Sequence, residues 1–366
     1  MPLIPLIGHD AIRARLLDAV GRDRLPAALL FHGEAGTGKE RLALWLAQRL
    51  LCETPSAQGA CGSCQHCRYV EMGAHPDLQW YVPRKSLKKS KPDTLDVMED
   101  MAEGIAERVS GGKRADAETP ALWRPAAGSE GYFVSTTRAI VERAALRPAM
   151  AQRRVILVPD VELMVVQAGN DAAANAFLKL LEEPDPQTTI LLTSSEPSAL
   201  LPTIRSRCVM IRVPVLTAQA TAALLEQPAF AAAVTDAGVP SGLDRRVQLA
   251  AGRPGRLLDG RSTDDARHAA GLMLDAARAA AVDRYAVSFT QGVAGARGDF
   301  SDRLDALSAL LRDEAEAAVR SGRDDAARRL ALAIVRVEHA KAEAYNNISP
   351  ALTTAVLLDD LAPLVA

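Results

Sequence analysis

The sequence predicts an α/β fold in which a parallel β-sheet carries helices and is followed by all-helical parts. Short apolar runs at 27–31, 155–158 and 188–193 have the length and composition of buried strands. Helical patterns separate these runs along the chain, which favours parallel pairing of the strands. From about residue 215 the chain carries helical patterns and turns but no convincing strand.

The individual elements follow from local spacing. Ile12, Leu16 and Val20 lie at helical intervals and predict a first helix over 9–20. A glycine-rich stretch follows the first strand, and a helix over 41–51 follows that stretch. Further helices are expected at 94–109, 135–146 and 170–183 within the sheet-forming part, and at 264–285, 301–320, 324–345 and 345–364 after it.

Size and composition limit the classes of function. A chain of 366 residues with 48% hydrophobic residues can form two or three domains with real cores. The net charge of −2 gives no global basic field, so contact with nucleic acid would be local or shared with other subunits. The first residues lack the pattern of a signal peptide, and no apolar run reaches the ~18 residues of a membrane span. We therefore expect a cytoplasmic protein with reduced cysteines and no membrane partner.

Residues 33–40 read G-E-A-G-T-G-K-E and nearly match the phosphate-binding P-loop pattern G-x-x-x-x-G-K-[ST]. Gly33, Gly38 and Lys39 stand at the pattern's fixed positions, and Gly36 adds a further glycine. The last position should carry a hydroxyl that ligates Mg²⁺, but Glu40 occupies it. The loop therefore keeps its phosphate-binding residues and lacks one metal ligand.

The second metal-binding position is altered as well. In an active P-loop ATPase an acidic residue at the end of a neighbouring strand helps to hold Mg²⁺. After the strand at 155–158, Pro159 occupies the place of that acid, and Asp160 occupies the place of the catalytic base. Two changes at one ion predict that ATP hydrolysis is lost. Residual nucleotide binding through Lys39 and the loop amides stays open, as does a glycine turn without any nucleotide role.

Four cysteines form the second pattern. Their spacing is C-x8-C-x2-C-x2-C, and the four residues are Cys52, Cys61, Cys64 and Cys67. Four thiolates can fill the tetrahedral shell of a structural Zn²⁺, with no position left for catalysis. Disulfides, unconnected core cysteines and an iron–sulfur cluster are the alternatives, and His66 and His75 are possible substitute ligands. A reducing compartment and the close spacing favour zinc.

Residues 84–130 interrupt the alternation of strands and helices. A basic run occupies 84–91, and the glycine pair at 111–112 and the stretch rich in proline, alanine and glycine at 119–129 indicate flexibility. We expect a surface insertion that is partly disordered around the helix at 94–109. The basic run could contact DNA, although a solvated loop is the simpler interpretation.

A third pattern, T-I-R-S-R-C at 203–208, follows the third predicted strand. One of its two arginines could reach the γ-phosphate bound by a neighbouring subunit, as an arginine finger supplied in trans. From position alone a local salt bridge is the favoured explanation of these arginines. The helix at 175–183 ends in the acidic pair Glu182-Glu183 before Pro184.

These patterns in this order resemble the clamp-loader subunits of bacterial DNA polymerase III, a family within the AAA+ ATPases. The resemblance lies in the P-loop, the four-cysteine insert after its helix, the L-K-L-L-E-E-P stretch at 178–184, and T-I-R-S-R-C. It is strong over 1–82 and 131–215, weak over the helical C-terminal region, and absent over 84–130. Motor subunits of the family keep both metal-binding residues. With Glu40 and Pro159 at these positions, the chain resembles the stationary member of the family, which does not hydrolyse ATP.

The resemblance implies the residue roles and the domains. Arg207 would be the finger that completes the ATP site of an adjacent motor subunit. The four cysteines would bind zinc, and the residues matching nucleotide-contacting positions are Gly33, Gly36, Gly38 and Lys39. The stretch 252–256 falls where the family has the sensor of its second domain, with the arginine offset. The implied domains are an AAA+ α/β domain at 1–214 with the zinc insert at 52–67 and the insertion at 84–130, a small helical domain at 215–262, and a helical collar at 263–366.

The resemblance also implies a function: a stationary subunit that helps to open the sliding clamp and place it on primed DNA during replication. No ATPase activity is expected of the chain alone, although it would be part of the DNA-directed DNA polymerase (nucleotidyltransferase) holoenzyme. Expected partners are the tau/gamma and delta subunits and, through the complex, the clamp and DNA. Two rivals stay open: an active motor ATPase in which Glu40 or Asp160 holds the metal unusually, and a zinc-dependent nucleic-acid-binding module that uses the cysteines and 85–91.

Overall fold

The computed structural model describes residues 5–84, 86–89, 92–110, 131–164, 172–290, 297–345 and 349–365. These residues divide into two compact units, the first ending at Asp259 and the second beginning at Gly260. The finer division into three domains, with boundaries after 214 and 262, stays a prediction.

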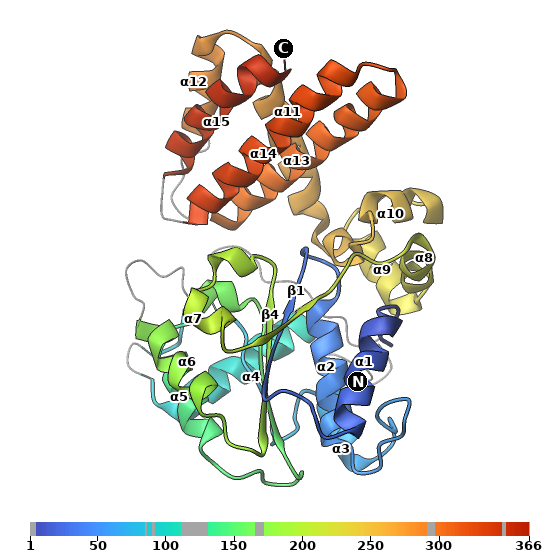
Figure 1. Ribbon diagram of the computed structural model, residues 1–366, viewed down its shortest axis with the longest axis vertical. Helices are drawn as coiled ribbons and strands as arrows, with labels where there is room; N and C mark the ends of the chain where they lie inside the picture. The colour runs from blue at the N-terminus through green and yellow to red at the C-terminus, as the bar shows by residue number, and fades with distance from the viewer. Residues whose placement is uncertain are drawn as a thin grey trace. The chain divides into compact units, whose positions relative to one another are not determined.

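The first unit is built on a five-stranded parallel sheet, which confirms the predicted α/β class (Figure 1). Its strands are β1 (Ala28–His32), β2 (Leu78–Trp80), β3 (Arg154–Val158), β4 (Thr188–Ser194) and β5 (Val209–Arg212). Their order across the sheet is β2-β3-β4-β1-β5. β1, β3 and β4 are the three strands predicted from the sequence, and the two edge strands were not predicted. Both edge strands are short: β2 has three residues, and β5 has four, of which Val209, Met210 and Ile211 are apolar.

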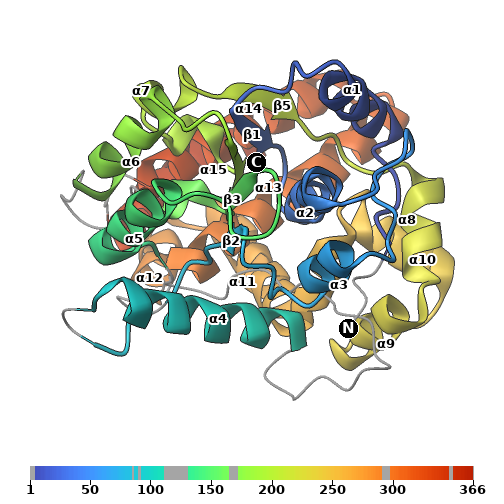
Figure 2. The ribbon, with the colours of Figure 1, turned by 90° about the horizontal axis from the view of Figure 1, so that it is seen from below.

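Helices cover both faces of this sheet (Figures 1 and 2). On one face lies α2 (Lys39–Leu51), with α1 (Asp10–Gly21) and α3 (Gln65–Glu71) beside it. The other face carries α5 (Val134–Ala144) and α6 (Ala172–Glu182), with α4 (Thr94–Ser110) packed on α5. The core lies between the layers and contains fully buried residues of β1, β3 and β4, among them Leu30, Ile156 and Leu191.

The predicted insertion at 84–130 is closed at its base. Arg84 and Gly131 exchange two backbone hydrogen bonds of 3.0 and 2.9 Å, so the chain leaves and re-enters the fold at one place. Within the insertion, α4 confirms the helix predicted at 94–109. Lys88 and Lys89 of the basic run form ion pairs with Glu103 and Asp96 of α4. The stretches predicted to be flexible, 111–112 and 119–129, lie outside the described residues, as does the predicted start of α6 at 170–171.

Short helices complete the first unit. They are η1 (Val161–Met164), η2 (Pro197–Ala199), α7 (Pro202–Arg205), α8 (Ala218–Leu225), α9 (Pro228–Asp236), α10 (Leu243–Ala250) and η3 (Pro254–Asp259). The last four elements surround a small core of their own, made by Leu225, Phe230, Val234, Ala250 and Leu257. This core is separate from the apolar core around the sheet.

The second unit consists of helices around a leucine-rich core. They are α11 (Gly260–Arg278), α12 (Ala281–Thr290), α13 (Arg297–Arg320), α14 (Asp324–Tyr345) and α15 (Pro350–Val365). In the part of the chain that the structure describes, no helix is both long and apolar enough to span a bilayer.

The single helix predicted at 264–285 is wrong, because the chain turns at residues 279–280 between α11 and α12. Ala279 and Ala280 are not helix-breaking residues, so the local sequence gives no signal for the turn. The turn allows α12 to pack along α15, where Arg284 Nε lies 2.7 Å from Asp359 Oδ1. Tertiary packing therefore overrides the local preference for helix.

Candidate functional site

The glycine-rich loop lies between β1 and α2, in the strand–loop–helix context that the sequence predicted. Gly33 and Gly36 have φ angles of 154° and 80°, in the region that favours glycine. A Cβ atom on Gly33 would lie 2.2 Å from the carbonyl oxygen of Val213, so no side chain fits there. Gly38 also has a positive φ and directly precedes Lys39, the first residue of α2.

Lys39 is bound by its own chain. It is only 6% exposed, and its Nζ donates to the carbonyl oxygens of Gly33 and Glu34, both at 2.9 Å, and to Ser195 Oγ at 3.0 Å. An ammonium group has three N–H donors, and all three are used by these bonds. A phosphate oxygen could bind Lys39 only by displacing one of these protein acceptors.

Acidic side chains surround this lysine. Burial lowers the pKa of Lys39, while the negative charges of Asp160, Glu162 and Glu40 act in the opposite direction. Burial, and secondarily the charge of Asp160, raises the pKa of Glu162 to about 7. A triphosphate entering this loop would meet carboxylates where an active P-loop ATPase offers a hydroxyl and a metal ion.

Glu40, the residue at the hydroxyl position, is itself part of the core. Its Oε1 accepts a hydrogen bond of 3.0 Å from the indole Nε1 of Trp80 on β2. Glu162 Oε1 accepts the backbone N–H of Ser195 at 2.8 Å. Trp80, Glu162 and Ser195 were not among the predicted site residues. Ser195 directly follows β4, but only the strand order shows that β4 lies next to β1.

A turn at residues 253–256 lies directly against the crest of the loop, within the same unit. The backbone N–H of Gly255 donates to the carbonyl oxygen of Gly36 at 3.0 Å. A Cβ atom on Gly36 would lie 2.9 Å from the backbone nitrogen of Arg256. Arg253 Nη1 forms an ion pair of 2.6 Å with Glu34 Oε2. Arg253 of this stretch therefore binds the glycine-rich loop of its own chain.

The four cysteines come together as predicted. Their Sγ atoms all lie within 4.8 Å of one another, with 3.9 Å between Cys52 and Cys64 and 3.9 Å between Cys61 and Cys67. A tetrahedral ion with Zn–S bonds of about 2.3 Å places its ligands about 3.8 Å apart. The cluster therefore has the dimensions of a single-ion site. Three backbone N–H groups of the insert also point at the sulfur atoms, at 3.3–3.4 Å.

The two histidines near the cluster have other partners. His75 Nε2 lies 2.8 Å from His66 Nδ1, and His66 Nε2 lies 3.2 Å from Glu53 Oε1. The remaining ring nitrogen of His75 accepts the backbone N–H of Asp77 at 3.0 Å. The ligand atoms that gather in one place are thus the four thiols, and the two histidines bond to each other, to Glu53 and to Asp77.

Arg207 lies between α7 and β5, two residues before the first residue of the missed edge strand. Its Nη2 lies 2.5 Å from Glu182 Oε1, and its Nη1 donates to the carbonyl oxygen of Thr203 at 2.9 Å. Its side chain is 31% exposed. The hydrogen bonds of Arg207 and those of Lys39 go to different residues, so the two predicted residues occupy separate sites.

The sheet and its loop define the chain as a P-loop α/β protein in which Glu40 and Pro159 stand at the two positions that would hold Mg²⁺ in an active ATPase. The family described as DNA polymerase III, delta subunit, matches residues 8–217, and the chain belongs to this family. The resemblance inferred from the sequence is thereby confirmed.

Individual relatives agree with this assignment. The chain is 34% identical over 216 residues to DNA polymerase III subunit delta′ of Pseudomonas aeruginosa, covering 58% of this chain and 52% of that protein. It is 29% identical over 181 residues to subunit delta′ of Escherichia coli, covering 50% and 40%. Subunit tau of Escherichia coli is 25% identical over 211 residues, covering 58% of this chain and 25% of tau. The matched region spans about half the length of the delta′ relatives or less.

Proposed function

We propose that the chain is the delta-prime subunit of a DNA polymerase III clamp loader, with the AAA+ fold, and that it serves as the stationary member that does not hydrolyse ATP. In this role it would assist in loading the sliding clamp on primed DNA. Its partners would be tau/gamma and delta and, through the complex, the clamp and DNA. Because its relatives are named as polymerase subunits, a cytoplasmic location belongs to the same proposal.

The main support for the proposal is that the phosphate-binding residues of the P-loop are bonded to other parts of this chain. All three donors of Lys39 are engaged by protein acceptors, and the crest of the loop lies against residues 253–256. Both Mg²⁺ positions lack their usual ligands, with Glu40 bonded to Trp80 instead. These features support a loop that connects parts of the first unit and leaves no place for a metal–triphosphate complex.

Zinc would have a structural role in the same subunit. The dimensions of the four-cysteine cluster fit a Zn²⁺ held by Cys52, Cys61, Cys64 and Cys67. These ligands connect the end of α2 to the start of α3, so one ion would fix the insert to the helix that follows the P-loop. Four protein ligands leave the ion no open position for chemistry.

Arg207 would act in the nucleotide site of a neighbouring motor subunit. A guanidinium can stabilise the charge that develops on the γ-phosphate during transfer, and fingers of this kind contribute ~10³–10⁵ in rate. The half-exposed position of Arg207 before β5 supports this assignment, because the residue is anchored to its own chain but accessible to a partner.

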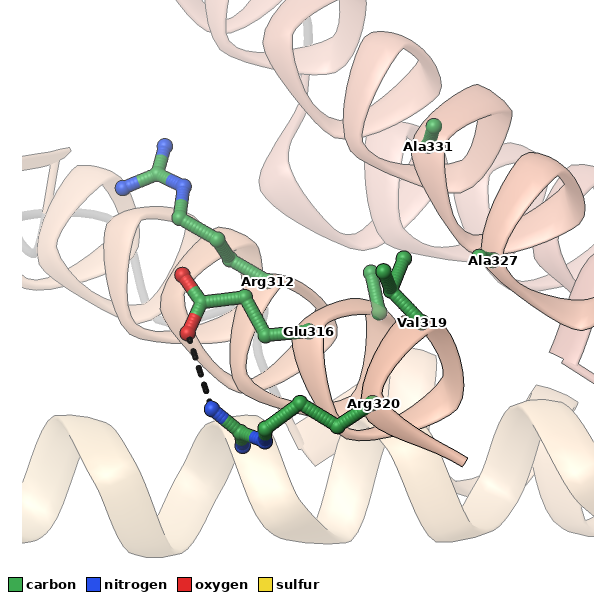
Figure 3. Close-up of a pocket in the computed structure, with 7 residues that line it drawn as sticks. Arg312, Glu316, Val319, Arg320, Ala327 and Ala331 are labelled. Carbon is green, nitrogen blue, oxygen red and sulfur yellow. Dashed lines mark ion pairs between the residues drawn. The ribbon is translucent and has the colours of Figure 1, made fainter. Parts of the chain in front are cut away.

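The second unit would provide collar contacts. Large apolar side chains are exposed on several of its helices, including Val282, Tyr285, Val319, Leu332, Val335, Leu352 and Val356. An open groove of about 400 Å³ is lined by residues of α13 and α14 (Figure 3). Alanines 315, 327 and 331 contribute small side chains to it, and Arg312 and the Glu316–Arg320 pair contribute charges. Small residues allow close approach of a partner helix, which supports a contact between subunits at this face.

The collar contact has a direct test. Ala331→Arg would fill the groove, whereas Ala317→Arg places the same side chain at an exposed position of α13 that does not line it. We expect the first variant to weaken assembly with the other subunits in size-exclusion chromatography and the second to leave it unchanged. If both variants assemble equally well, the groove is not part of the interface between subunits.

Hydrolysis tests the proposal as a whole. We expect no ATP turnover by the isolated chain, and none in a reconstituted complex whose motor subunits have lost their P-loop lysines. Turnover in that complex that is abolished by Lys39→Ala would instead identify this chain as an active motor. Similarity to subunit tau makes the active motor the alternative function.

The finger is tested in the intact complex. Arg207→Ala should leave assembly unchanged and reduce turnover at the one site it completes by roughly 10³-fold, visible as a partial loss of DNA-stimulated turnover. Arg212→Ala, an exposed arginine on β5, is the matched control and should have no such effect. Unchanged turnover of the Arg207 variant would remove the finger assignment.

A further inference from the structure

We propose that Glu182 is a positioning residue that holds Arg207 against its own chain until a neighbour's triphosphate competes for the guanidinium. The inference rests on the proposed role of Arg207 and adds a partner for it within this chain. The observed contact is the 2.5 Å ion pair between Arg207 Nη2 and Glu182 Oε1. The hydrogen bond from Nη1 to Thr203 holds the same guanidinium from a second side.

Both partners stand on firmly anchored backbone. Glu182 is the last residue of α6, whose Phe177 and Leu181 are buried in the core of the first unit. Arg207 follows α7, which the fully buried Ile204 fixes to the same core. The contact is therefore a defined feature of the fold, although the side chains themselves are 31% and 49% exposed.

The position of Glu182 also explains why it attracts a cation. An acidic side chain in the last turn of a helix lies at the negative end of the helix dipole, which is unfavourable for it. α6 ends at Glu182, a second acid, Glu183, follows directly, and Arg207 supplies a positive charge at that end. The pair thus relieves an unfavourable arrangement that the E-E-P sequence creates.

The contact has a consequence for the finger. With Glu182 bonded to it, the guanidinium offers a partner only part of its positive charge and three of its five N–H donors. A γ-phosphate carries more negative charge than a carboxylate and can compete for the same group. Exposed ion pairs are weak, so the restraint should lower the neighbour's reactivity by a factor of roughly 1.5–5.

The experiment uses Glu182→Gln in the complete reconstituted clamp loader, with kcat and KM for ATP measured in the presence of primed DNA. Glutamine keeps the size of the side chain and removes its charge. We expect kcat/KM to rise about 1.5- to 5-fold, with assembly unchanged, and the gain to shrink as salt screens the ion pair. Glu183→Gln removes the adjacent charge and should leave kcat/KM as in the native complex.

The double variant Glu182→Gln/Arg207→Ala separates this mechanism from a structural effect. If Glu182 acts through Arg207, the double variant behaves as Arg207→Ala alone, without any gain. An unchanged or lowered kcat/KM of Glu182→Gln, in a complex where Arg207→Ala is impaired, overturns the inference and leaves the proposed function intact. If Arg207→Ala has no effect, the finger assignment fails, and this inference fails with it.

Discussion

Removal of the cysteine cluster is the perturbation whose size follows most directly from the structure. In the double variant Cys61→Ser/Cys64→Ser, two of the four thiolates are lost and no tetrahedral site remains. The ion would otherwise tie Cys52 at the end of α2 to Cys67 in α3, closing a loop of 16 residues between them. A disulfide that closes a loop of about this length stabilises a folded protein by roughly 3 kcal/mol in the chain-entropy description, and we take this value as the scale for a Zn²⁺ that stays bound to all four thiolates.

The free energy of unfolding of the first unit should therefore fall by about 3 kcal/mol. This loss raises the unfolded population by a factor of more than about 100. With a urea dependence of about 1–3 kcal/mol per molar, the midpoint of unfolding should fall by roughly 1 M or more. Tryptophan fluorescence follows this transition well, because Trp45 is packed beside the insert: a Cβ on Gly59 would lie 3.7 Å from the Trp45 Nε1 atom. Metal analysis of the native chain should give about one Zn²⁺.

The control is the fifth cysteine. Cys208 precedes β5, outside the cluster, and is partly buried, so Cys208→Ser changes a cysteine without touching the metal ligands. This variant should keep its zinc and its sensitivity to chelators. The reasoning is refuted if the double variant retains a full equivalent of metal, or if a chelator leaves the native urea midpoint where it was.

Two further regions give predictions of the same kind. Asp77 is 0% exposed and accepts three backbone N–H groups of the turn at 149–151, at 2.6–2.7 Å, so Asp77→Asn should cost roughly 1.5–3 kcal/mol in urea unfolding at pH 7. Burial tends to raise the pKa of Asp77, but these hydrogen bonds outweigh it and hold the pKa below its ordinary value, so the stabilisation is complete above about pH 4 and is lost as the pH falls through the lowered value. The difference between native chain and variant should accordingly shrink in acid, and a difference independent of pH would contradict this explanation. Gly255→Ala places a Cβ 2.8 Å from the Cα of Gly36 and should destabilise the first unit by about 1–3 kcal/mol. The control is Gly271→Ala, which has open space around it in α11 and should be neutral or stabilising. Equal unfolding midpoints for the two variants would show that the turn at 253–256 does not press on the glycine-rich loop.

The residues of the glycine-rich loop have structural contacts of their own in this chain. The glycines still set the backbone, since Gly33 has no room for a side chain beside Val213. The Lys39 ammonium joins the loop to Ser195 after β4. These contacts give the loop a structural role between β1, α2 and β4.

The sequence by itself determined the features that lie within a short stretch of chain. The spacing of Cys52, Cys61, Cys64 and Cys67 was sufficient to predict a cluster, because ligands on one short loop have few ways to arrange themselves. The strand–glycine loop–helix order predicted the P-loop, and the replacement of both Mg²⁺ positions by Glu40 and Pro159 needed no coordinates.

Only the tertiary structure decided which distant residues meet. Strand order placed Ser195 beside Lys39, the turn at 253–256 came to lie on Gly36, and α6 brought Glu182 to Arg207. The short edge strands and the break between α11 and α12 were likewise not predicted from local patterns. Each of these depends on the packing of elements far apart in the chain, and local periodicity carries no information on the partners that such packing selects.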